Sequence, residues 1–205
     1  MSADTQKLGR PNCESLEQKL LLLKTEYLGI DAEELFSYCL TLDTWEQKEL
    51  VIFGKKRMIP RLSVAYGNSD LTYEYSGITH RLNQLNQQFS ILLDKVSNYF
   101  NVHFNYILLN LYRNGYDSIG WHSDNERCLG NKIDIAMISL GTTRTFKLKN
   151  NINKATVSLK LKHGSLLLMK HPIQVRYKHC LPKMPRITEP RISITFRQIR
   201  GQTTR

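Results

Sequence analysis

The spacing of apolar residues changes from helical to strand-like along the chain. Acidic residues at positions 31–34 are typical of a first helical turn and predict an amphipathic helix to about Leu40. A Leu-rich run at positions 20–23 favours a shorter helix before it, and helical spacing predicts a longer one over 83–100. Short apolar or alternating runs predict strands at 45–53, 62–66, 71–75, 104–113, 133–140, 144–149, 156–161, 165–169, 175–179 and 191–199. Many short strands after a helical start indicate an α+β chain with a jelly-roll or barrel core and supporting helices.

The charge of the chain indicates a polyanionic partner. The formal net charge is +11, and residues 160–205 hold eleven Lys or Arg against a single acid, Glu189. Such a balance favours nucleic acid, the alternative being a generally basic surface without a polyanion site. No apolar run reaches membrane-spanning length, and neither a signal peptide nor a zinc-like cysteine spacing is found. We therefore expect an intracellular protein with free thiols and no membrane association.

Two pairs of residues suggest a chemistry. His122 and Asp124 stand two apart, so on a strand they would point to the same side. A second histidine from a distant strand would complete the 2-His-1-carboxylate set that holds Fe(II) in non-heme oxygenases and leaves positions open. Arg191 and Arg197 stand six apart and would share one face of a strand near the C-terminus. A planar guanidinium binds a carboxylate such as those of 2-oxoglutarate through two hydrogen bonds.

These residues belong to an ordered series of motifs, at 110–113, 117–126, 163–169, 179 and 191–197. The series resembles the AlkB family, the Fe(II)- and 2-oxoglutarate-dependent dioxygenases that remove alkyl groups from nucleic-acid bases. Upstream motifs at 53–55, 60–61, 65–67 and 71–77 are similar to the animal and plant branch that repairs duplex DNA. The resemblance implies a double-stranded β-helix (jelly-roll or cupin-like) core with supporting N-terminal helices. It divides the chain into an N-terminal helical extension, 1–45, and a dioxygenase domain, 46–200, that includes nucleotide-recognition strands over 51–80.

The resemblance also implies roles for individual residues. Carried over position by position, it gives His122, Asp124 and His179 as iron ligands. His163 and His171 are rivals for the third place, but His179 has the expected spacing to Arg191 and His163 begins a turn. The implied 2-oxoglutarate residues are Asn110, Tyr112, Arg191, Thr195 and Arg197. Iron, 2-oxoglutarate and O2 would together oxidise the N-alkyl carbon, which then leaves as an aldehyde.

The implied substrate residues lie on both sides of the iron motif. Tyr75 resembles the family's stacking aromatic, flanked by Tyr73 and Glu74, although cross-strand packing is the alternative for both tyrosines. Asn125 and Glu126 would contact the base. Phe53 and Gly54 resemble the apolar finger that fills the gap left by a flipped base, and a buried core Phe is the alternative. Lys55 is placed beside this finger, and Lys56, Arg57 and Arg61 would contact phosphates.

The sequence therefore predicts a dioxygenase that demethylates N-alkylated bases such as 1-methyladenine and 3-methylcytosine in duplex or single-stranded DNA. An RNA demethylase on the same fold and a catalytically inactive nucleic-acid-binding jelly roll are the alternatives. We expect a monomer, located in the nucleus if the source is eukaryotic and in the cytoplasm if it is prokaryotic.

Overall fold

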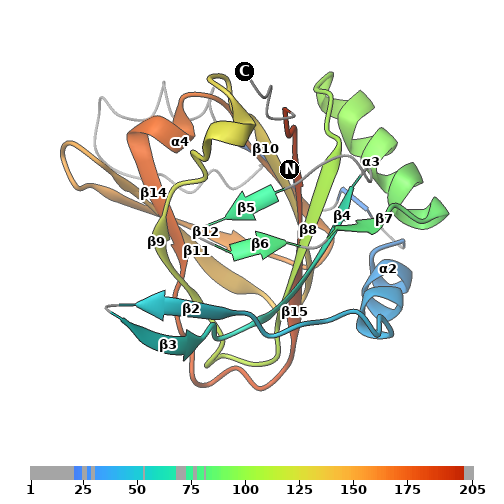
Figure 1. Cartoon of the computed structure of the whole chain (residues 1–205), viewed down its shortest axis with the longest axis horizontal. Coiled ribbons are helices and arrows are strands. Elements are labelled where there is room, and N and C mark those ends of the chain that lie inside the picture. The colour runs from blue at the N-terminus through green and yellow to red at the C-terminus, as the bar shows by residue number, and fades with distance from the viewer. Residues whose placement is uncertain are drawn as a thin grey trace, which may run out of the picture.

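The computed structural model describes residues 21–24, 27–28, 31–52, 54–67, 73–75, 78–80 and 82–200. Within these residues, seven strands form a major sheet in the order β1-β13-β10-β15-β8-β4-β7, and four form a minor sheet in the order β12-β11-β14-β9. The major-sheet strands are β1 (Leu21–Lys24), β4 (Leu62–Gly67), β7 (Leu82–Gln84), β8 (Tyr106–Tyr112), β10 (Ile135–Gly141), β13 (Ser165–Met169) and β15 (Arg191–Arg197). The minor-sheet strands are β9 (Ile119–His122), β11 (Arg144–Asn150), β12 (Thr156–Leu161) and β14 (Tyr177–Leu181). The α+β prediction with a jelly-roll core is confirmed (Figure 1).

Helices cover one face of the major sheet, while the other face meets the minor sheet (Figure 1). The helices are α2 (Asp31–Leu40) and α3 (Gln87–Phe100), and a short α4 (Ile173–Arg176) precedes β14. Because side chains alternate along a strand, β15 sends Ile192, Ile194 and Phe196 into the helix-facing core. The alternating residues face the space between the two sheets: Arg191, Ser193, Thr195 and Arg197. Buried on both faces, β15 can therefore present polar side chains to an enclosed site.

The long helix begins later than the apolar spacing predicts. The Asn86 side chain accepts a hydrogen bond from the Phe89 N–H at 2.9 Å and so caps α3. Residues 82–84 instead form β7, which pairs in parallel with β4. The helix ends at Asn101, whose φ of 52° is left-handed. The predicted helix is therefore correct from Gln87 onward.

The prediction of a short helix in the Leu-rich segment is wrong. Leu21–Lys24 forms β1, which pairs antiparallel with β13 at the edge of the major sheet. Leu21 and Leu23 pack against the core between the sheets, so tertiary contact overrides the helical propensity of leucine. Residues 1–20 lie outside the described residues, and the division at residue 45 stays a prediction.

Other strand boundaries also differ from the sequence predictions. Pairing places β2 at Glu49–Ile52 and β3 at Lys55–Met58, a hairpin that includes the basic cluster predicted to follow the first strand. The segment 71–75, predicted as an aromatic strand, contains β5 (Tyr73–Tyr75), which pairs with β6 (Ile78–His80), a strand that the sequence did not predict. Residues 175–176, predicted as strand, belong to α4. No helix among the described residues is long and apolar enough to span a membrane.

Gly115 connects the loop after β8 to the loop before β15 through two backbone hydrogen bonds. Its N–H donates to the Ile187 carbonyl at 2.8 Å, and its carbonyl accepts from the Met184 N–H at 2.8 Å. A Cβ at Gly115 would lie 1.8 Å from the Met184 oxygen, which is backbone and cannot move aside. We expect Gly115→Ala to lower the free energy of unfolding by about 3 kcal/mol, the upper end for overpacking. Urea unfolding would measure this, with Gly120→Ala, which meets no atom within 4 Å, as control. Equal midpoints for the two variants would contradict the expectation.

Candidate iron and 2-oxoglutarate site

Strand pairing brings the three predicted iron ligands together. In the minor sheet, His122 of β9 lies directly opposite His179 of β14, with ring centroids 4.2 Å apart. Asp124 follows β9 and places Oδ1 3.5 Å from His122 Nε2. One ligand atom from each residue lies within 4.8 Å of the other two. Two imidazoles and a carboxylate at this spacing suit Fe(II), and a three-ligand face leaves further positions for other ligands.

Surrounding groups fix the orientation and charge of these ligands. The Nδ1–H of His122 donates to the Gly120 carbonyl at 2.8 Å, which leaves Nε2 facing Asp124. Burial lowers the pKa of His122, and lowers the pKa of His179 to about 3, so both imidazoles are neutral. Burial alone would raise the pKa of Asp124, but Arg197 and the two histidines hold it below its ordinary range. The Asp124 Oδ2 accepts from the Arg197 guanidinium at 2.8 Å.

The rival histidines have other positions. The Nδ1 of His163 accepts from the Gly141 N–H at 2.8 Å, which fits a turn residue. The backbone N–H of His171 donates to Asp134 at 2.7 Å. Neither belongs to the three-residue cluster found among the described residues. The choice of His179 as the third candidate ligand therefore agrees with the geometry.

The neutral state of His179 gives a pH prediction for the metal-free protein. The folded chain takes up a proton there only near pH 3, whereas an unfolded histidine does so near pH 6.5. The contribution of His179 to folding stability is therefore fully present above about pH 6.5. Below that pH it decreases by about 1.4 kcal/mol per pH unit. Between pH 7 and pH 5, wild type should lose about 2 kcal/mol more than His179→Gln in urea unfolding with a chelator present. His103→Gln, which changes an exposed histidine, should lose as much unfolding free energy between pH 7 and pH 5 as wild type does. If His179→Gln also lost as much as wild type, the neutral state of His179 in the folded protein would be contradicted.

Arg191 lies at the opposite end of β15 from Arg197, and both line the same cavity as the three candidate ligands. Its guanidinium is buried, donates to Ser139 Oγ at 2.7 Å and lies over the Tyr112 ring at 5.3 Å. Within the described residues it forms no ion pair with any carboxylate, and its Nε has no hydrogen-bond partner. Burial lowers the pKa of Arg191 to about 10, so it remains charged at neutral pH. A buried cation with open donors is suited to an anionic ligand.

The remaining predicted co-substrate residues surround the same cavity. Asn110 and Tyr112 of β8 and Thr195 of β15 are buried and line it. In the β8–β15 register, Tyr112 lies opposite Arg191, Asn110 opposite Ser193, and Thr195 opposite Leu108. Ser193, which stands between the two arginines, also lines it. The strand register thus brings the polar faces of β8 and β15 to one space.

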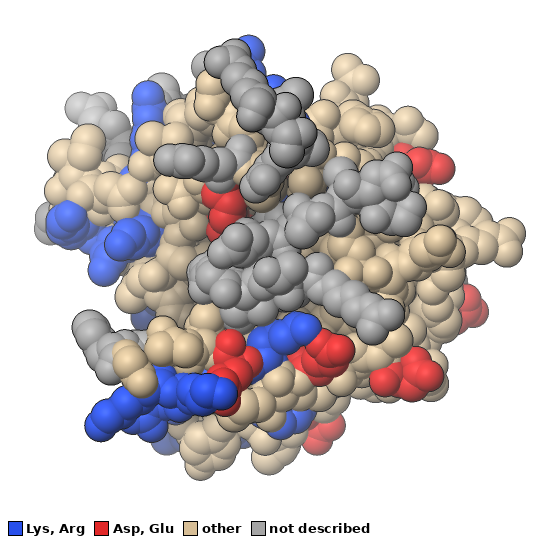
Figure 2. Space-filling model, viewed as in Figure 1, with Lys and Arg blue, Asp and Glu red and all other residues tan. Residues whose placement is uncertain are grey.

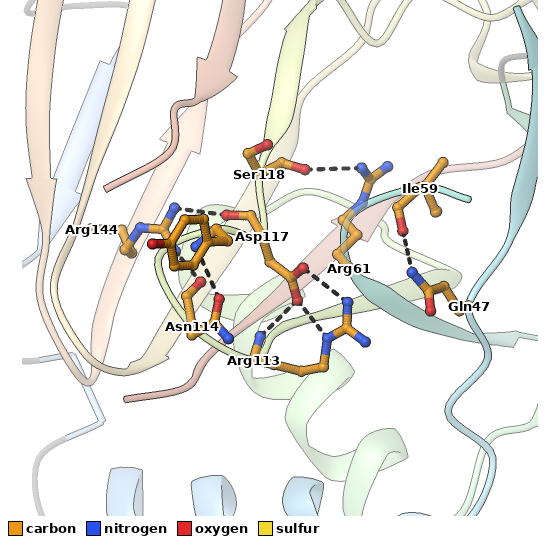
Figure 3. Close-up of polar contacts among 9 residues, drawn as sticks. Gln47, Ile59, Arg61, Arg113, Asn114, Asp117, Ser118 and Arg144 are labelled. Atoms are coloured by element: carbon orange, nitrogen blue, oxygen red, sulfur yellow. Dashed lines mark hydrogen bonds and ion pairs between the residues drawn. The ribbon is translucent and has the colours of Figure 1, made fainter. Parts of the chain in front are cut away.

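The placement of Arg61 corrects one prediction. Its side chain is only 8% exposed and forms part of the cavity wall instead of the outer surface. Its Nε donates to Asn110 Oδ1 at 3.0 Å. One of its terminal nitrogens donates to the Ser118 carbonyl at 3.4 Å, as Figure 3 shows. A guanidinium committed to these internal contacts does not suit the predicted surface contact with a phosphate. Arg61 instead orients Asn110.

Sequence reasoning missed several residues that support the site. Arg144 is fully buried and donates to the carbonyls of Asn114, Asp117 and Pro182, as Figure 3 shows for the first two. Arg113 binds the Asp117 carboxylate through two nitrogens in the same loop. Three further residues contact the site directly: Phe146 stacks on His179, Gln174 accepts from the Asp124 N–H, and Ser139 accepts from Arg191. These contacts join residues far apart in sequence, and no local pattern signals them.

The predicted substrate residues are placed less completely. Gly54 forms the turn between β2 and β3 with φ of 72°, and Lys55, Lys56 and Arg57 are exposed on β3 (Figure 2). Asn125 is exposed just beyond Asp124, with Glu126 after it half-buried. Phe53 lies outside the described residues. For Tyr73, Glu74 and Tyr75 the structure describes the backbone of β5 alone, so their roles stay predictions.

Comparison with known proteins identifies the class. The family model described as "2OG-Fe(II) oxygenase superfamily" matches residues 27–197. The chain therefore belongs to this superfamily, whose iron and 2-oxoglutarate fit the His122-Asp124-His179 cluster and the buried Arg191.

Named relatives narrow the resemblance. The chain is 36% identical over 156 residues to human "DNA oxidative demethylase ALKBH2", a match covering 72% of this chain and 60% of the relative. It is 34% identical over 165 residues to human "Alpha-ketoglutarate-dependent dioxygenase alkB homolog 3", covering 76% and 57%. A solved structure titled "The structure of OsALKBH1" aligns with a TM-score of 0.61 at 16% identity over 94% of this chain and 100% of that one, which supports the fold. The AlkB resemblance is confirmed, and the chain spans about 60% of the length of the first of these relatives.

Proposed function

We propose that this chain is an Fe(II)- and 2-oxoglutarate-dependent dioxygenase that removes alkyl groups from N-alkylated bases, such as 1-methyladenine and 3-methylcytosine, in DNA. The observation that carries the proposal is the pairing, in one cavity, of the His122-Asp124-His179 cluster with the buried Arg191. A cluster alone would suit many metal proteins. The additional buried guanidinium, without a described carboxylate partner, favours a co-substrate that brings its own carboxylate.

Each residue of the cavity has a distinct task in this proposal. His122, Asp124 and His179 would hold iron, and Arg197 keeps Asp124 ionised and oriented. Arg191 would bind the distal carboxylate of 2-oxoglutarate, while Tyr112, Asn110 and Thr195 would contact its body. When bound, the iron with 2-oxoglutarate and O2 supplies oxidation of the N-alkyl carbon. The chain contributes the orientation of these groups, and no general base is needed.

DNA is the substrate favoured by the basic hairpin and by the relatives. Lys55, Lys56 and Arg57 form an exposed basic strand next to the Gly54 turn, and they would contact phosphates beside the proposed finger. Tyr75 would stack on the flipped base, with Tyr73 and Glu74 beside it and Asn125 and Glu126 at its edge. Human ALKBH2 is named a DNA oxidative demethylase, which supports the same class of substrate here. We propose a monomer that acts in the nucleus if eukaryotic and in the cytoplasm if prokaryotic.

Product mass on defined oligonucleotides would test the proposal. Oligonucleotides carrying 1-methyladenine as single-stranded DNA, duplex DNA and RNA would be incubated with Fe(II), ascorbate and 2-oxoglutarate. Loss of a methyl group that depends on 2-oxoglutarate would support the reaction. Preferential loss on RNA would favour the RNA demethylase, and binding without any loss would favour the inactive nucleic-acid-binding protein.

The finger hypothesis gives a separate prediction. An apolar wedge offsets lost stacking only where a base leaves a duplex, so Phe53→Ala should reduce duplex repair about tenfold and single-strand repair much less. The ratio of kcat/KM on the two substrates measures this. Met58→Ala, which removes an exposed apolar side chain from β3 of the same hairpin, is the matched control. Equal loss on both substrates would remove the finger from the proposal.

A further inference from the structure

Lysines gather on the outward face of the minor sheet. The inward face of β11 buries Arg144, Phe146 and Leu148, so the alternating residues Lys147 and Lys149 point outward. Lys160 of β12 and Lys178 of β14 are exposed on the same face. Figure 2 shows basic side chains gathered at the left edge of the molecule, beside these strands. We call Lys147, Lys149, Lys160 and Lys178 the lysine face.

The lysine face has no counter-charge of its own. Strands β9, β11, β12 and β14 contain no Asp or Glu. Within the described residues, none of the four ammonium groups forms an ion pair with a carboxylate. Lys149 and Lys178 are direct cross-strand partners in the β11–β14 register, and like charges placed opposite each other destabilise a sheet. The fold therefore retains a repulsive pair that an external anion would relieve.

An aromatic side chain belongs to the same face. Trp121 is 39% exposed, and the Lys149 ammonium lies 4.5 Å from its ring centroid. Trp121 directly precedes His122, so the indole points outward while the imidazole points into the cavity. β9 is the edge strand of the minor sheet, so the lysine face and the candidate iron site meet at this edge. Cations that follow a backbone, with an aromatic surface for a base, are the two parts of a single-strand binding surface.

We propose that the lysine face and Trp121 bind single-stranded nucleic acid that flanks the modified base, its phosphates on the lysines and a base stacked on the indole. This inference rests on the proposed function, because the nucleotides on the lysine face belong to the same nucleic-acid strand as the modified base that enters the cavity. The surface is separate from the basic β2–β3 hairpin. It would contribute affinity for long strands without touching the reacting atoms.

Salt dependence of binding is the main test. Lys149→Ala/Lys178→Ala would be compared with wild type for affinity to an unmodified 20-nucleotide single strand over a range of salt. Each lost phosphate contact lowers the slope of log affinity against log salt by about 0.7, so the double variant should lose about 1.4. Lys95→Ala, on α3 on the opposite side of the major sheet, should keep the wild-type slope. An unchanged slope in the double variant would overturn the proposal.

Fluorescence tests the aromatic part, because the chain has two tryptophans. Trp45 is half-buried and donates to the Cys39 carbonyl at 3.0 Å, so quenching by the oligonucleotide should come from Trp121 and vanish in Trp121→Phe. Trp121→Ala should weaken binding about 5- to 150-fold, the range for one stacked base, and Trp121→Phe should restore most of it. Quenching that persists in Trp121→Phe would overturn the stacking role.

Two further measurements separate this inference from the proposed function. On a methylated mononucleotide, which has no flanking nucleotides to bind the lysine face, the double lysine variant should turn over like wild type, and its urea midpoint should not fall. If wild type turns over no substrate, the proposed function fails while the salt slopes still decide the surface. Vesicles of phosphatidylserine test a membrane instead: binding that the double variant loses, together with an unchanged nucleic-acid slope, would overturn the proposal.

Discussion

Both Asp124→Asn and Asp124→Ala should abolish turnover. Asp124→Asn should keep the fold, whereas Asp124→Ala should also destabilise the chain. The Asn oxygen can still accept the Arg197 hydrogen bond that Asp124 Oδ2 accepts at 2.8 Å, but its amide then directs N–H groups toward the iron position. Iron affinity should fall by more than about a hundredfold, because changes to groups behind the ligands already cost 10- to 100-fold. Both variants remove the negative charge beside Arg197, but alanine also removes the hydrogen-bond acceptor, so it should lose more unfolding free energy than asparagine, about 3–5 kcal/mol.

Iron titration, product mass and urea unfolding on the same preparations would check this pair. Asn125→Ala changes the exposed neighbouring residue and should keep both iron affinity and stability near wild type. Demethylation by Asp124→Asn at the wild-type rate would remove Asp124 from the iron site. Equal stability of the Ala and Asn variants would contradict the importance of the Arg197 pair.

The second large effect concerns Arg191. Arg191→Met should weaken 2-oxoglutarate binding by about thirtyfold or more, since loss of a buried charge partner costs 2 kcal/mol or more. In the absence of co-substrate the same variant should be at least as stable as wild type, because it replaces a buried cation without a described carboxylate partner by an apolar side chain. A merely structural arginine would show the opposite pattern, with lower stability and unchanged affinity.

Calorimetric titration of 2-oxoglutarate into the metal-loaded protein, together with urea unfolding of the free protein, measures both quantities. Arg186→Met removes an exposed arginine from the loop before β15 and should change neither. Wild-type affinity in Arg191→Met would assign the distal carboxylate to another residue.

The sequence could predict what local periodicity determines. Period-two alternation located most strands of both sheets, and the spacing of His122 and Asp124 correctly placed them on one side. The N-terminal leucines were misassigned because a short apolar run suits a helix and an edge strand equally well, and only β13 decides between them. The correct secondary-structure predictions depend on residues that are neighbours in sequence, whereas the wrong ones depend on contacts between segments far apart in sequence.

The same distinction explains the site. The resemblance pointed to Arg191, but nothing local indicates that Ser139 accepts its hydrogen bond, since this requires the β10–β15 register. Arg61 was misplaced because arginine is usually exposed, and its burial follows from the pairing of β4 with β8 beside Asn110. Buried polar contacts across sheets are therefore the part of the site that the sequence does not encode in any short pattern.

β15 has one more consequence, for the length of molecule that the cavity can accept. Arg191 and Arg197 stand at its two ends, about 20 Å apart along the strand at 3.3 Å per residue, and β8 and β10 hydrogen-bond it on both sides. A strand held in this way cannot stretch or slide to suit a different ligand. The distance between the Arg197 end of the cavity, near the candidate iron ligands, and the Arg191 end is therefore fixed. Dicarboxylates one methylene shorter or longer than 2-oxoglutarate would satisfy one end of the cavity and miss the other.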